Sequence, residues 1–422
     1  MTSRVKDLPR LTPAIVGVLA VVWALVVVTA RGDHHTRPFA EQANIARHLV
    51  LGHGFRSPMN TAPDAPPSAW SPPLYPLAIA AAYRIFGLTS QPAVVALLVL
   101  NALCYAAIVM ATLAISTRLF QSQVPGLIAA GVLAVHPVFR VGMGDFWDGF
   151  LALAMFAWLT ATAVRRGDAG STGNLTLAGA AGFGAGLGLL ALTNASYIIT
   201  FPVLLFMAGR GPFARSRLLA AGVATAACLA IIAPWTIRNY AAFGRWVPIR
   251  TGAGVQFWIG NPPISHGWLD QPAFAVHPYA NPSERALMLQ IGEPAYDDLV
   301  FVRFERAMLE RPLGYLASCL RRLAYLLIGN PTKPGRPPLF VGWELDAIAW
   351  RSLAFAVALA ILGFGGMLVA RRSGYAQHGL PLLAASVGLP FVFSAMLDRY
   401  SLPLRWLLTI YAGGCIWLIR RR

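Results

Sequence analysis

Two acidic residues of this sequence lie in polar stretches between long apolar segments, where a carboxylate could act as a general base. Glu41 lies in RGDHHTRPFAEQANIARHLVLGHGF, and Asp148 lies in HPVFRVGMGDFWDGFLAL. A carboxylate held beside apolar groups has a raised pKa, which suits it to take a proton from a hydroxyl group. The two acids, Glu41 and Asp148, are therefore compatible with a general base and an orienting partner, with Asp33 and Asp145 as secondary candidates. The simpler interpretations are an interfacial Glu41 paired with Arg37, and an Asp that starts a helix.

Arginine residues in two further stretches could bind a phosphate group. Arg238, Arg245 and Arg250 follow one another in APWTIRNYAAFGRWVPIRTGAG, and Arg399 precedes Tyr400 in LDRYSLPLRW. Guanidinium groups match the geometry of phosphate oxygens. The three arginines of the first stretch therefore suit a phosphate or pyrophosphate, whereas Arg399 could also pair with Asp398 and fix a turn. The alternative for each arginine is that it reaches toward lipid headgroups.

Histidine and cysteine residues do not show metal-binding spacing. His48 lies seven residues after Glu41, on the same face of an expected helix, and is a secondary site candidate together with Asn194. A pattern such as HExxH is absent, so we expect no metal and no other cofactor, and a divalent metal has no support in the sequence. The four cysteines lie in or beside apolar runs and are expected to behave as small hydrophobic residues.

The composition indicates which elements must position these groups. The 422 residues are 57% hydrophobic and only 12% charged, and the mean hydropathy is +0.59, whereas about a quarter of the residues of a soluble domain are charged. The sequence therefore predicts an all-α polytopic membrane protein and excludes a soluble enzyme, a disordered chain and a disulfide scaffold. The net charge of +17 is explained by arginines that set membrane orientation, so no nucleic-acid partner is expected.

About ten apolar segments are suited to cross the membrane, because about 20 apolar residues span the hydrocarbon core. They are residues 12–30, 94–117, 125–139, 147–164, 175–192, 196–209, 218–236, 348–370, 379–397 and 402–419. The segment 72–87 is short and carries Arg84, so we expect it to lie in the interface. Every end predicted to be cytoplasmic is then basic, as the positive-inside rule requires. Both termini are expected in the cytoplasm, and the candidate site at the outer face.

This topology divides the chain into three parts. Residues 1–236 form an N-terminal transmembrane module, whose first outer loop covers residues 31–93. Residues 237–347 form an outer-face and juxtamembrane segment with a helical run at 283–310, and residues 348–422 form the C-terminal transmembrane helices. Glycines spaced by four residues between 182 and 188 indicate close helix packing.

Several motifs occur in an order that matches a known superfamily. The first loop carries the pattern IAxxLxxGxGF…PPLYPxxxAxxYxxFG through Ile45, Ala46, Leu49, Gly52, Gly54, Phe55, Pro72, Pro73, Leu74, Tyr75, Pro76, Ala80, Tyr83, Phe86 and Gly87. An acid at Asp148, LTN at 192–194, PWxxRNY at 234–240 and RYxxP at 399–403 follow. In this order the motifs resemble the GT-C superfamily of membrane glycosyltransferases, in particular the bacterial branch with the aminoarabinose transferase of lipid A and the protein O-mannosyltransferases. That family usually has an acid pair where this chain has Pro38 and Phe39, and a Lys where it has Asn194.

The resemblance implies an inverting glycosyltransferase of the bacterial inner membrane. It would transfer a hexosyl or pentosyl group from a polyprenyl-phosphate donor to a lipid, glycan or protein acceptor at the outer face, with membrane lipids around it. Under this resemblance we expect Glu41 to be the base and Asp148 to orient the acceptor or support the base. The residues expected to hold the donor phosphate are Arg238, Arg245, Arg399 and Tyr400. Two alternatives stay open: a transporter or lipid flippase, and a catalytically inactive relative that assists envelope assembly. The sequence has no internal repeat, and its ionisable residues cluster at helix ends, which favours the enzyme over the transporter.

Overall fold

The computed structural model describes residues 13–30, 40–166, 176–209, 215–330, 347–375 and 377–421. Across these ranges the regular structure is helical, and the single β-type pairing is an isolated bridge between Arg56 and Pro67. The all-α class expected from the sequence is confirmed. The secondary candidate Asp33 lies outside the described residues. Arg37, the alternative partner of Glu41 in the first loop, lies outside them as well.

Within the described residues, five helices are long and apolar enough to cross a membrane on their own. They are α1 (Pro13–Ala30), α4 (Gln91–Phe120), α10 (Arg215–Phe243), α16 (Ala347–Arg372) and α19 (Leu402–Arg421). The other predicted spans correspond to α5 (Val124–Val135), α7 (Gly149–Arg166), α8 (Leu177–Thr193), η1 (Ala195–Thr200) with α9 (Phe201–Ala208), and α17 (Leu380–Val387) with α18 (Leu389–Phe393). The chain is therefore a polytopic membrane protein.

Proline and glycine explain where the predicted spans are interrupted. The span expected at 125–139 ends as α5 at Val135, and the short α6 (Pro137–Gly142) follows. Proline disfavours helical backbone at the preceding residue, and His136 is extended there with φ −66° and ψ 121°. The span expected at 379–397 is likewise divided at Gly388, where α17 ends and α18 begins.

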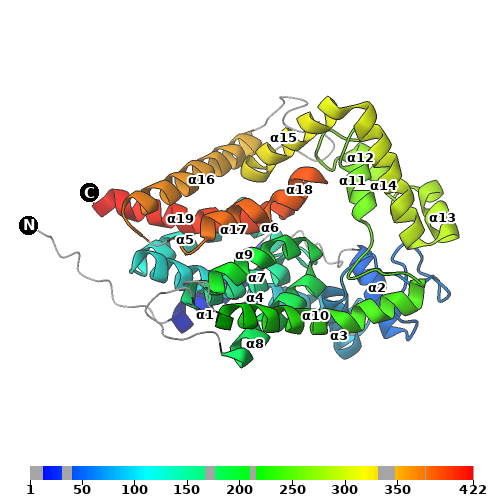
Figure 1. Ribbon diagram of the computed structural model, residues 1–422, viewed down its shortest axis with the longest axis horizontal. Coiled ribbons are helices and arrows are strands. Elements are labelled where there is room, and N and C mark those ends of the chain that lie inside the picture. The colour runs from blue at the N-terminus through cyan, green and yellow to red at the C-terminus, as the bar shows by residue number, and fades with distance from the viewer. Residues whose placement is uncertain are drawn as a thin grey trace, which may run out of the picture.

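The centre of the bundle is formed by α4, α5, α7 and α19, with α1 packed on α4 and α16 packed on α19 (Figure 1). The pair of α8 and α10 lies beside this centre. A Cβ atom at Gly184 would collide with the backbone of Ala224, and one at Gly188 would lie 2.8 Å from the carbonyl oxygen of Cys228. The small-residue spacing therefore allows these two helices to approach closely, as expected.

Two helices of the first outer loop pack against each other beside the bundle. They are α2 (Ala40–Val50) and α3 (Leu74–Phe86), and α3 also contacts α4. The α2 helix is followed by Gly52, whose φ of 81° is favourable only for glycine. The 13 residues of α3 extend about 20 Å, less than the roughly 30 Å hydrocarbon core. Because α5, a predicted span, has only 12 residues, the interfacial position of α3 stays a prediction from its Arg84 and from the positive-inside rule.

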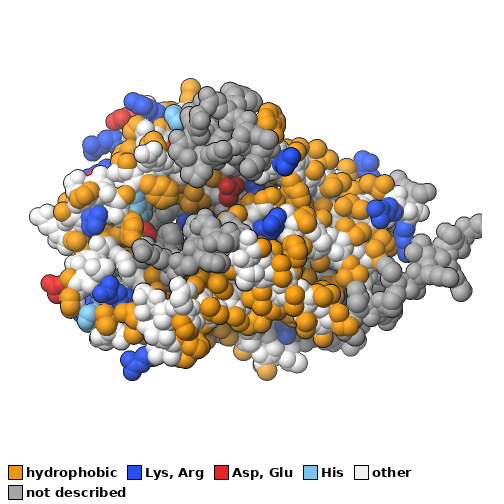
Figure 2. Space-filling model, turned by 180° about the vertical axis from the view of Figure 1, so that it is seen from behind, with side chains coloured by type: hydrophobic (Ala, Val, Ile, Leu, Met, Phe, Trp, Pro, Cys, Tyr) orange, Lys and Arg blue, Asp and Glu red, His pale blue; other side chains and the backbone are white. Residues whose placement is uncertain are grey.

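The described part of residues 237–347, which is expected at the outer face and is called the outer-face segment below, forms a group of helices at one end of the molecule. It contains α11 (Ala253–Ile259), α12 (Gln271–Ala275), α13 (Pro282–Ile291), α14 (Glu293–Glu310) and α15 (Pro312–Ile328). The helical run expected at 283–310 is split at Gly292, which has a φ of 88°. Figure 1 shows α11–α14 opposite the end where α16 and α19 finish, and Figure 2 shows hydrophobic side chains over much of the bundle between these ends.

Candidate functional site

A cavity of about 680 Å³ lies between the bundle and the outer-face helices. Its walls come from the start of α2, the loop before α3, the loop before α7, the start of η1, the chain between α10 and α11, α18 and η2 (Asp398–Ser401). The sequence-predicted residues Glu41, Asp148, Asn194, Arg399 and Tyr400 all line it. Residues from widely separated parts of the chain therefore converge on one cavity.

Glu41 lies in the first turn of α2 and is largely buried, with 17% of its side chain exposed. Its Oε1 lies 3.8 Å from Nε2 of His277, which follows α12. Burial raises the pKa of Glu41, and a hydrogen bond with Trp70 and the charges of Arg250 and Arg399 offset part of that rise. The carboxylate is therefore more basic than an exposed glutamate and faces the cavity.

The neighbouring His277 is uncharged near neutral pH. Burial lowers its pKa to about 4, and the positive charge of Arg250 acts in the same direction. The imidazole also packs edge-on against Trp70, with 5.6 Å between the ring centroids. The side chain of Glu41 thus contacts a neutral imidazole and an indole, so its negative charge is compensated mainly by more distant arginines.

Asp148 immediately precedes α7, and both of its carboxylate oxygens accept hydrogen bonds. Oδ1 accepts from Nε2 of Gln42 at 3.3 Å, and Oδ2 accepts from Nδ2 of Asn194 at 2.8 Å. Its backbone carbonyl accepts from the amide of Ala152, so it does begin the helix, but its side chain is turned to the cavity. Burial raises its pKa to about 6, and the two amide donors and nearby arginines oppose the rise.

The two arginines that line the cavity are Arg250 and Arg399. Nε of Arg250 donates to the carbonyl of Thr251 at 2.8 Å. The guanidinium of Arg399 lies 4.3 Å from the ring centroid of Trp147 and 5.6 Å from that of Tyr400. These contacts place two cations in the same cavity as the two carboxylates, which suits an anionic ligand such as a phosphate.

Two arginines expected at the phosphate site lie elsewhere. Arg238 donates to the carbonyls of Ser68 and Phe55 at 2.6 and 2.7 Å and stacks between two aromatic rings. Arg245 is exposed and pairs with Asp298 at 2.7 Å. Neither lines the cavity. The reason is that α10 continues to Phe243, so Arg238 lies within the helix and holds the first outer loop instead of facing the cavity.

Two secondary candidates also lie outside the cavity lining. His48 is buried, and its Nε2 lies 2.8 Å from the carbonyl oxygen of Asn60, so it fixes the loop after α2. The backbone carbonyl of Asp145 accepts a hydrogen bond from Asn101 at 2.8 Å. Each contact therefore joins a helix to a loop, His48 of α2 to Asn60 and Asn101 of α4 to Asp145, and neither side chain lines the cavity.

A buried carboxylate beside the cavity holds three separate segments together. Glu293, at the start of α14, accepts hydrogen bonds from Oγ of Ser68 at 2.6 Å, from the amide of Ala69 at 2.8 Å and from Oγ1 of Thr251 at 2.5 Å. These residues flank Trp70 and Arg250. Sequence reasoning did not identify Glu293, His277, Trp70 or Gln42.

An apolar groove adjoins the polar cavity. It has a volume of about 830 Å³ and lies between α8, η1 with α9, and α10. Its lining includes Leu187, Phe201, Leu205, Cys228, Ile232 and Ala233. Ile198, Pro248 and Ile249 line both the groove and the cavity. An amphiphile could therefore place a polar head in the cavity and an apolar chain in the groove.

The described titratable side chains around the cavity do not form a cluster of metal ligands. In the described part of the chain, no group of three or more His, Cys, Asp or Glu side chains is placed to hold a metal ion. The cavity carboxylates instead accept hydrogen bonds from side-chain amides and lie near arginines.

Comparison with known proteins gives matches among solved structures alone. No protein-family model matches the sequence, and no curated protein is significantly similar to it. The oligosaccharyltransferase AglB of Archaeoglobus fulgidus, in complex with an inhibitory peptide and a dolichol-phosphate, matches with a TM-score of 0.58 and 14% identity over 96% of this chain. The same enzyme in its apo form matches with a TM-score of 0.55 and 16% identity over 97% of this chain. The undecaprenyl phosphate complex of ArnT from Cupriavidus metallidurans matches with a TM-score of 0.39 and 14% identity. This match covers 96% of this chain and 77% of the ArnT chain.

The two AglB matches establish the fold. This chain spans about half the length of the AglB chains, which are covered over 50% and 51%. The resemblance to the GT-C superfamily that the motifs indicated is confirmed as a shared GT-C fold.

Proposed function

We propose that this protein is a glycosyltransferase that moves a sugar from a polyprenyl-phosphate donor to an acceptor hydroxyl at the outer face of the bacterial inner membrane. Both termini would lie in the cytoplasm. The observation that carries the proposal is the junction of the polar cavity with the apolar groove through Ile198, Pro248 and Ile249. A lipid-linked sugar phosphate is an amphiphile with these two kinds of surface. The AglB structure that shares the fold contains a dolichol-phosphate.

The cavity contains the groups that a single displacement needs. The acceptor oxygen forms a bond to the anomeric carbon while the bond from that carbon to the donor phosphate breaks, and the configuration inverts. The proton of the acceptor hydroxyl passes to the carboxylate of Glu41, whose pKa is raised by burial. The polyprenyl phosphate leaves as an anion, and the guanidinium groups of Arg250 and Arg399 stabilise the charge that develops on it.

Asp148 has a different role in this proposal. Both of its oxygens accept hydrogen bonds, from Gln42 and Asn194, so its orientation is fixed. A fixed carboxylate in the cavity can accept a hydrogen bond from a sugar or acceptor hydroxyl and so orient it. In the described part of the chain, Glu41 lies 3.8 Å from a neutral imidazole and accepts a hydrogen bond from Trp70, which leaves lone pairs of the carboxylate available for proton transfer.

The test uses the purified chain in lipid nanodiscs with polyprenyl-phosphate donors that carry a labelled sugar. Lipid and glycan fractions of a bacterial envelope serve as acceptors. We expect release of polyprenyl phosphate together with transfer of label, and loss of both in Glu41→Gln. Passage of intact donor across a vesicle membrane, without breakage of the sugar–phosphate bond, would instead support a flippase. Absence of turnover with every donor would support an inactive assembly partner.

A further inference from the structure

The helix α15 has an apolar stripe that no part of the described chain covers. Leu313, Leu316, Leu320 and Leu323 are spaced by three and four residues and therefore lie on one face of the helix. Their exposed fractions are 80%, 54%, 61% and 46%. These four outward-facing leucines form an apolar surface. Contact of such a surface with water is unfavourable, which marks it as an interaction surface.

The opposite face of α15 is firmly attached to the molecule through the buried Arg322. Its Nε donates to the carbonyl of Val392 at 2.6 Å, and its Nη1 donates to the carbonyl of Gly260 at 2.7 Å and to Oδ1 of Asn261 at 2.9 Å. The carbonyls of Val392 and Gly260 lie at the ends of α18 and α11, both of which contribute residues to the cavity wall. The orientation of α15 is therefore fixed, and its leucine face cannot turn inward.

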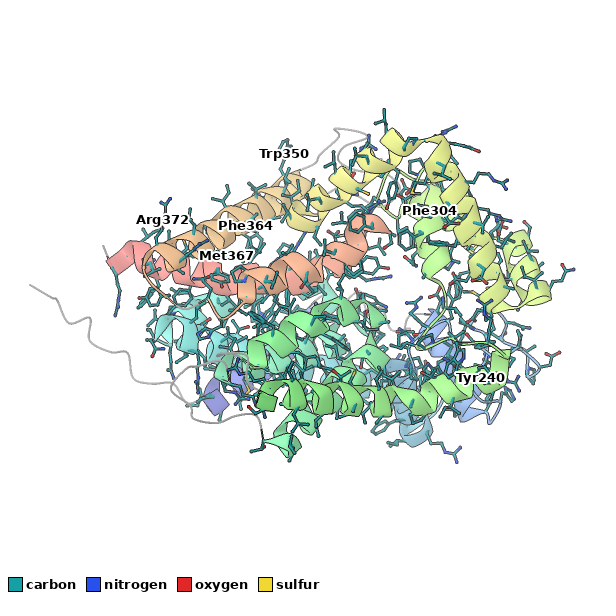
Figure 3. All side chains as sticks on the ribbon, in the orientation of Figure 1. Tyr240, Phe304, Trp350, Phe364, Met367 and Arg372 are labelled. Carbon is teal, nitrogen blue, oxygen red and sulfur yellow. The ribbon has the colours of Figure 1, made fainter. Side chains whose placement is uncertain are left out.

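The position of α15 indicates what its leucine stripe contacts. The helix packs against α16, which is a membrane span. Trp350, near the start of α16, is 56% exposed, and Figure 3 shows it pointing away from the bundle. Tryptophan is enriched where membrane spans meet the lipid headgroups. The exposed face of α16 continues along Ile361, Phe364 and Leu368, so the leucine stripe adjoins a surface that faces lipid.

We infer that α15 is an amphipathic anchor whose leucine stripe inserts among the acyl chains of the outer leaflet. Arg311, exposed at the start of the helix, provides a cation for the lipid phosphates. Arg322 then connects the lipid-bound helix to α18 and α11. The partner is the bilayer itself, and this assignment does not depend on which reaction the cavity performs.

Site-specific photocrosslinking in native membranes tests the inference. p-Benzoylphenylalanine replaces Leu316 or Leu320 in the full chain, and mass spectrometry identifies the molecule bonded after irradiation. We expect phospholipid adducts at both positions. The matched control replaces Glu305, an exposed residue of α14, and is expected to yield at least tenfold less lipid adduct.

Two results would overturn the inference. One is a lipid yield at Leu316 and Leu320 equal to that at Glu305, which would mean that the stripe faces water. The other is a polypeptide adduct at these positions, which would mean that a protein partner covers the stripe. Each variant carries a single replacement on an exposed face. Its folding is checked by size-exclusion chromatography, in which its elution should be unchanged.

Discussion

The carboxylate of Glu41 lies 3.8 Å from the imidazole of His277, although the first comes from the first outer loop and the second from the outer-face helices. Burial raises the pKa of the carboxyl group and lowers that of the imidazole to about 4. The pair therefore consists of an unusually basic carboxylate and a neutral ring. The packing of the outer-face segment beside the first outer loop buries both groups. The raised pKa of Glu41 therefore depends on the fold of a segment that is distant in sequence.

The first prediction concerns the proposed base. Glu41→Gln keeps the size of the side chain but cannot accept a proton, and general-base catalysis contributes about 10²–10⁴-fold to a rate. We expect transfer from a labelled donor to fall by about that factor. The matched control, Glu305→Gln, changes an exposed glutamate of α14 and should leave the rate unchanged. Unchanged turnover in Glu41→Gln would assign the base to Asp148 or to Asp33.

The second prediction follows from the raised pKa of Asp148, which is about 6. The folded protein binds this proton more tightly than the unfolded chain, so the stability associated with it is fully present below about pH 4, the ordinary pKa of an aspartate, and is lost as the pH rises through about 6. Asp148→Asn does not titrate, so its free energy of unfolding relative to the parent protein should rise by about 1–3 kcal/mol between pH 4.5 and pH 7.5. Thermal denaturation of both proteins at pH 4.5 and pH 7.5 measures this. A difference between them that does not change with pH would contradict the prediction.

The third prediction compares an arginine that lines the cavity with an arginine that lies outside it. Arg250 lines the cavity, whereas Arg245 is exposed and paired with Asp298. Arg250→Ala should lower kcat for transfer by about 10²-fold, since loss of one group that stabilises developing charge typically costs about 10²–10³-fold. Arg245→Ala should change kcat by less than about twofold, because an exposed ion pair contributes little. Equal effects of the two substitutions would place the leaving phosphate away from Arg250.

The fourth prediction concerns the attachment of the first outer loop. Glu293→Ala leaves the amide of Ala69 and the hydroxyls of Ser68 and Thr251 without their acceptor. Buried donors without partners cost about 1–3 kcal/mol each, so we expect thermal stability to fall by several degrees. Glu293→Gln keeps an acceptor oxygen and should lose less than half as much. If Glu293→Ala melts like the parent protein, the three segments are held by other contacts.

The sequence predicted most of the spans and the convergence of Asp148, Asn194 and Arg399. Each of these residues lies at or beside an end of an apolar segment, and the predicted topology brings these ends to the same side of the membrane. The sequence could not show that Arg250, and not Arg238, lines the cavity, because this depends on where α10 ends. An apolar count ends the span near residue 236, whereas the helix continues to Phe243 and carries Arg238 toward the first loop.

The contribution of the outer-face segment could not be predicted for a similar reason. His277 follows the five-residue helix α12 in a loop, so no hydrophobic period shows which way its side chain points. Its place beside Glu41 results from the packing of α11 on α14 and from the hydrogen bonds of Glu293 to the first outer loop. These are tertiary contacts, and the local sequence of neither segment shows that it will contact the other.

The fifth prediction tests whether the apolar groove holds the donor lipid. Ala233 lines the groove, and replacing it with tryptophan adds a bulky ring there while leaving the polar cavity unchanged. Ala226 lies on the same helix, is exposed and does not line the groove, so Ala226→Trp is the matched control. We expect KM for a long-chain donor to rise about tenfold or more in Ala233→Trp and to stay unchanged in Ala226→Trp. A water-soluble donor with a short chain should be used equally well by both variants, because it does not fill the groove. A rise in KM for the short-chain donor as well would show that the tryptophan disturbs the cavity, and no rise for either donor would show that the lipid chain lies elsewhere.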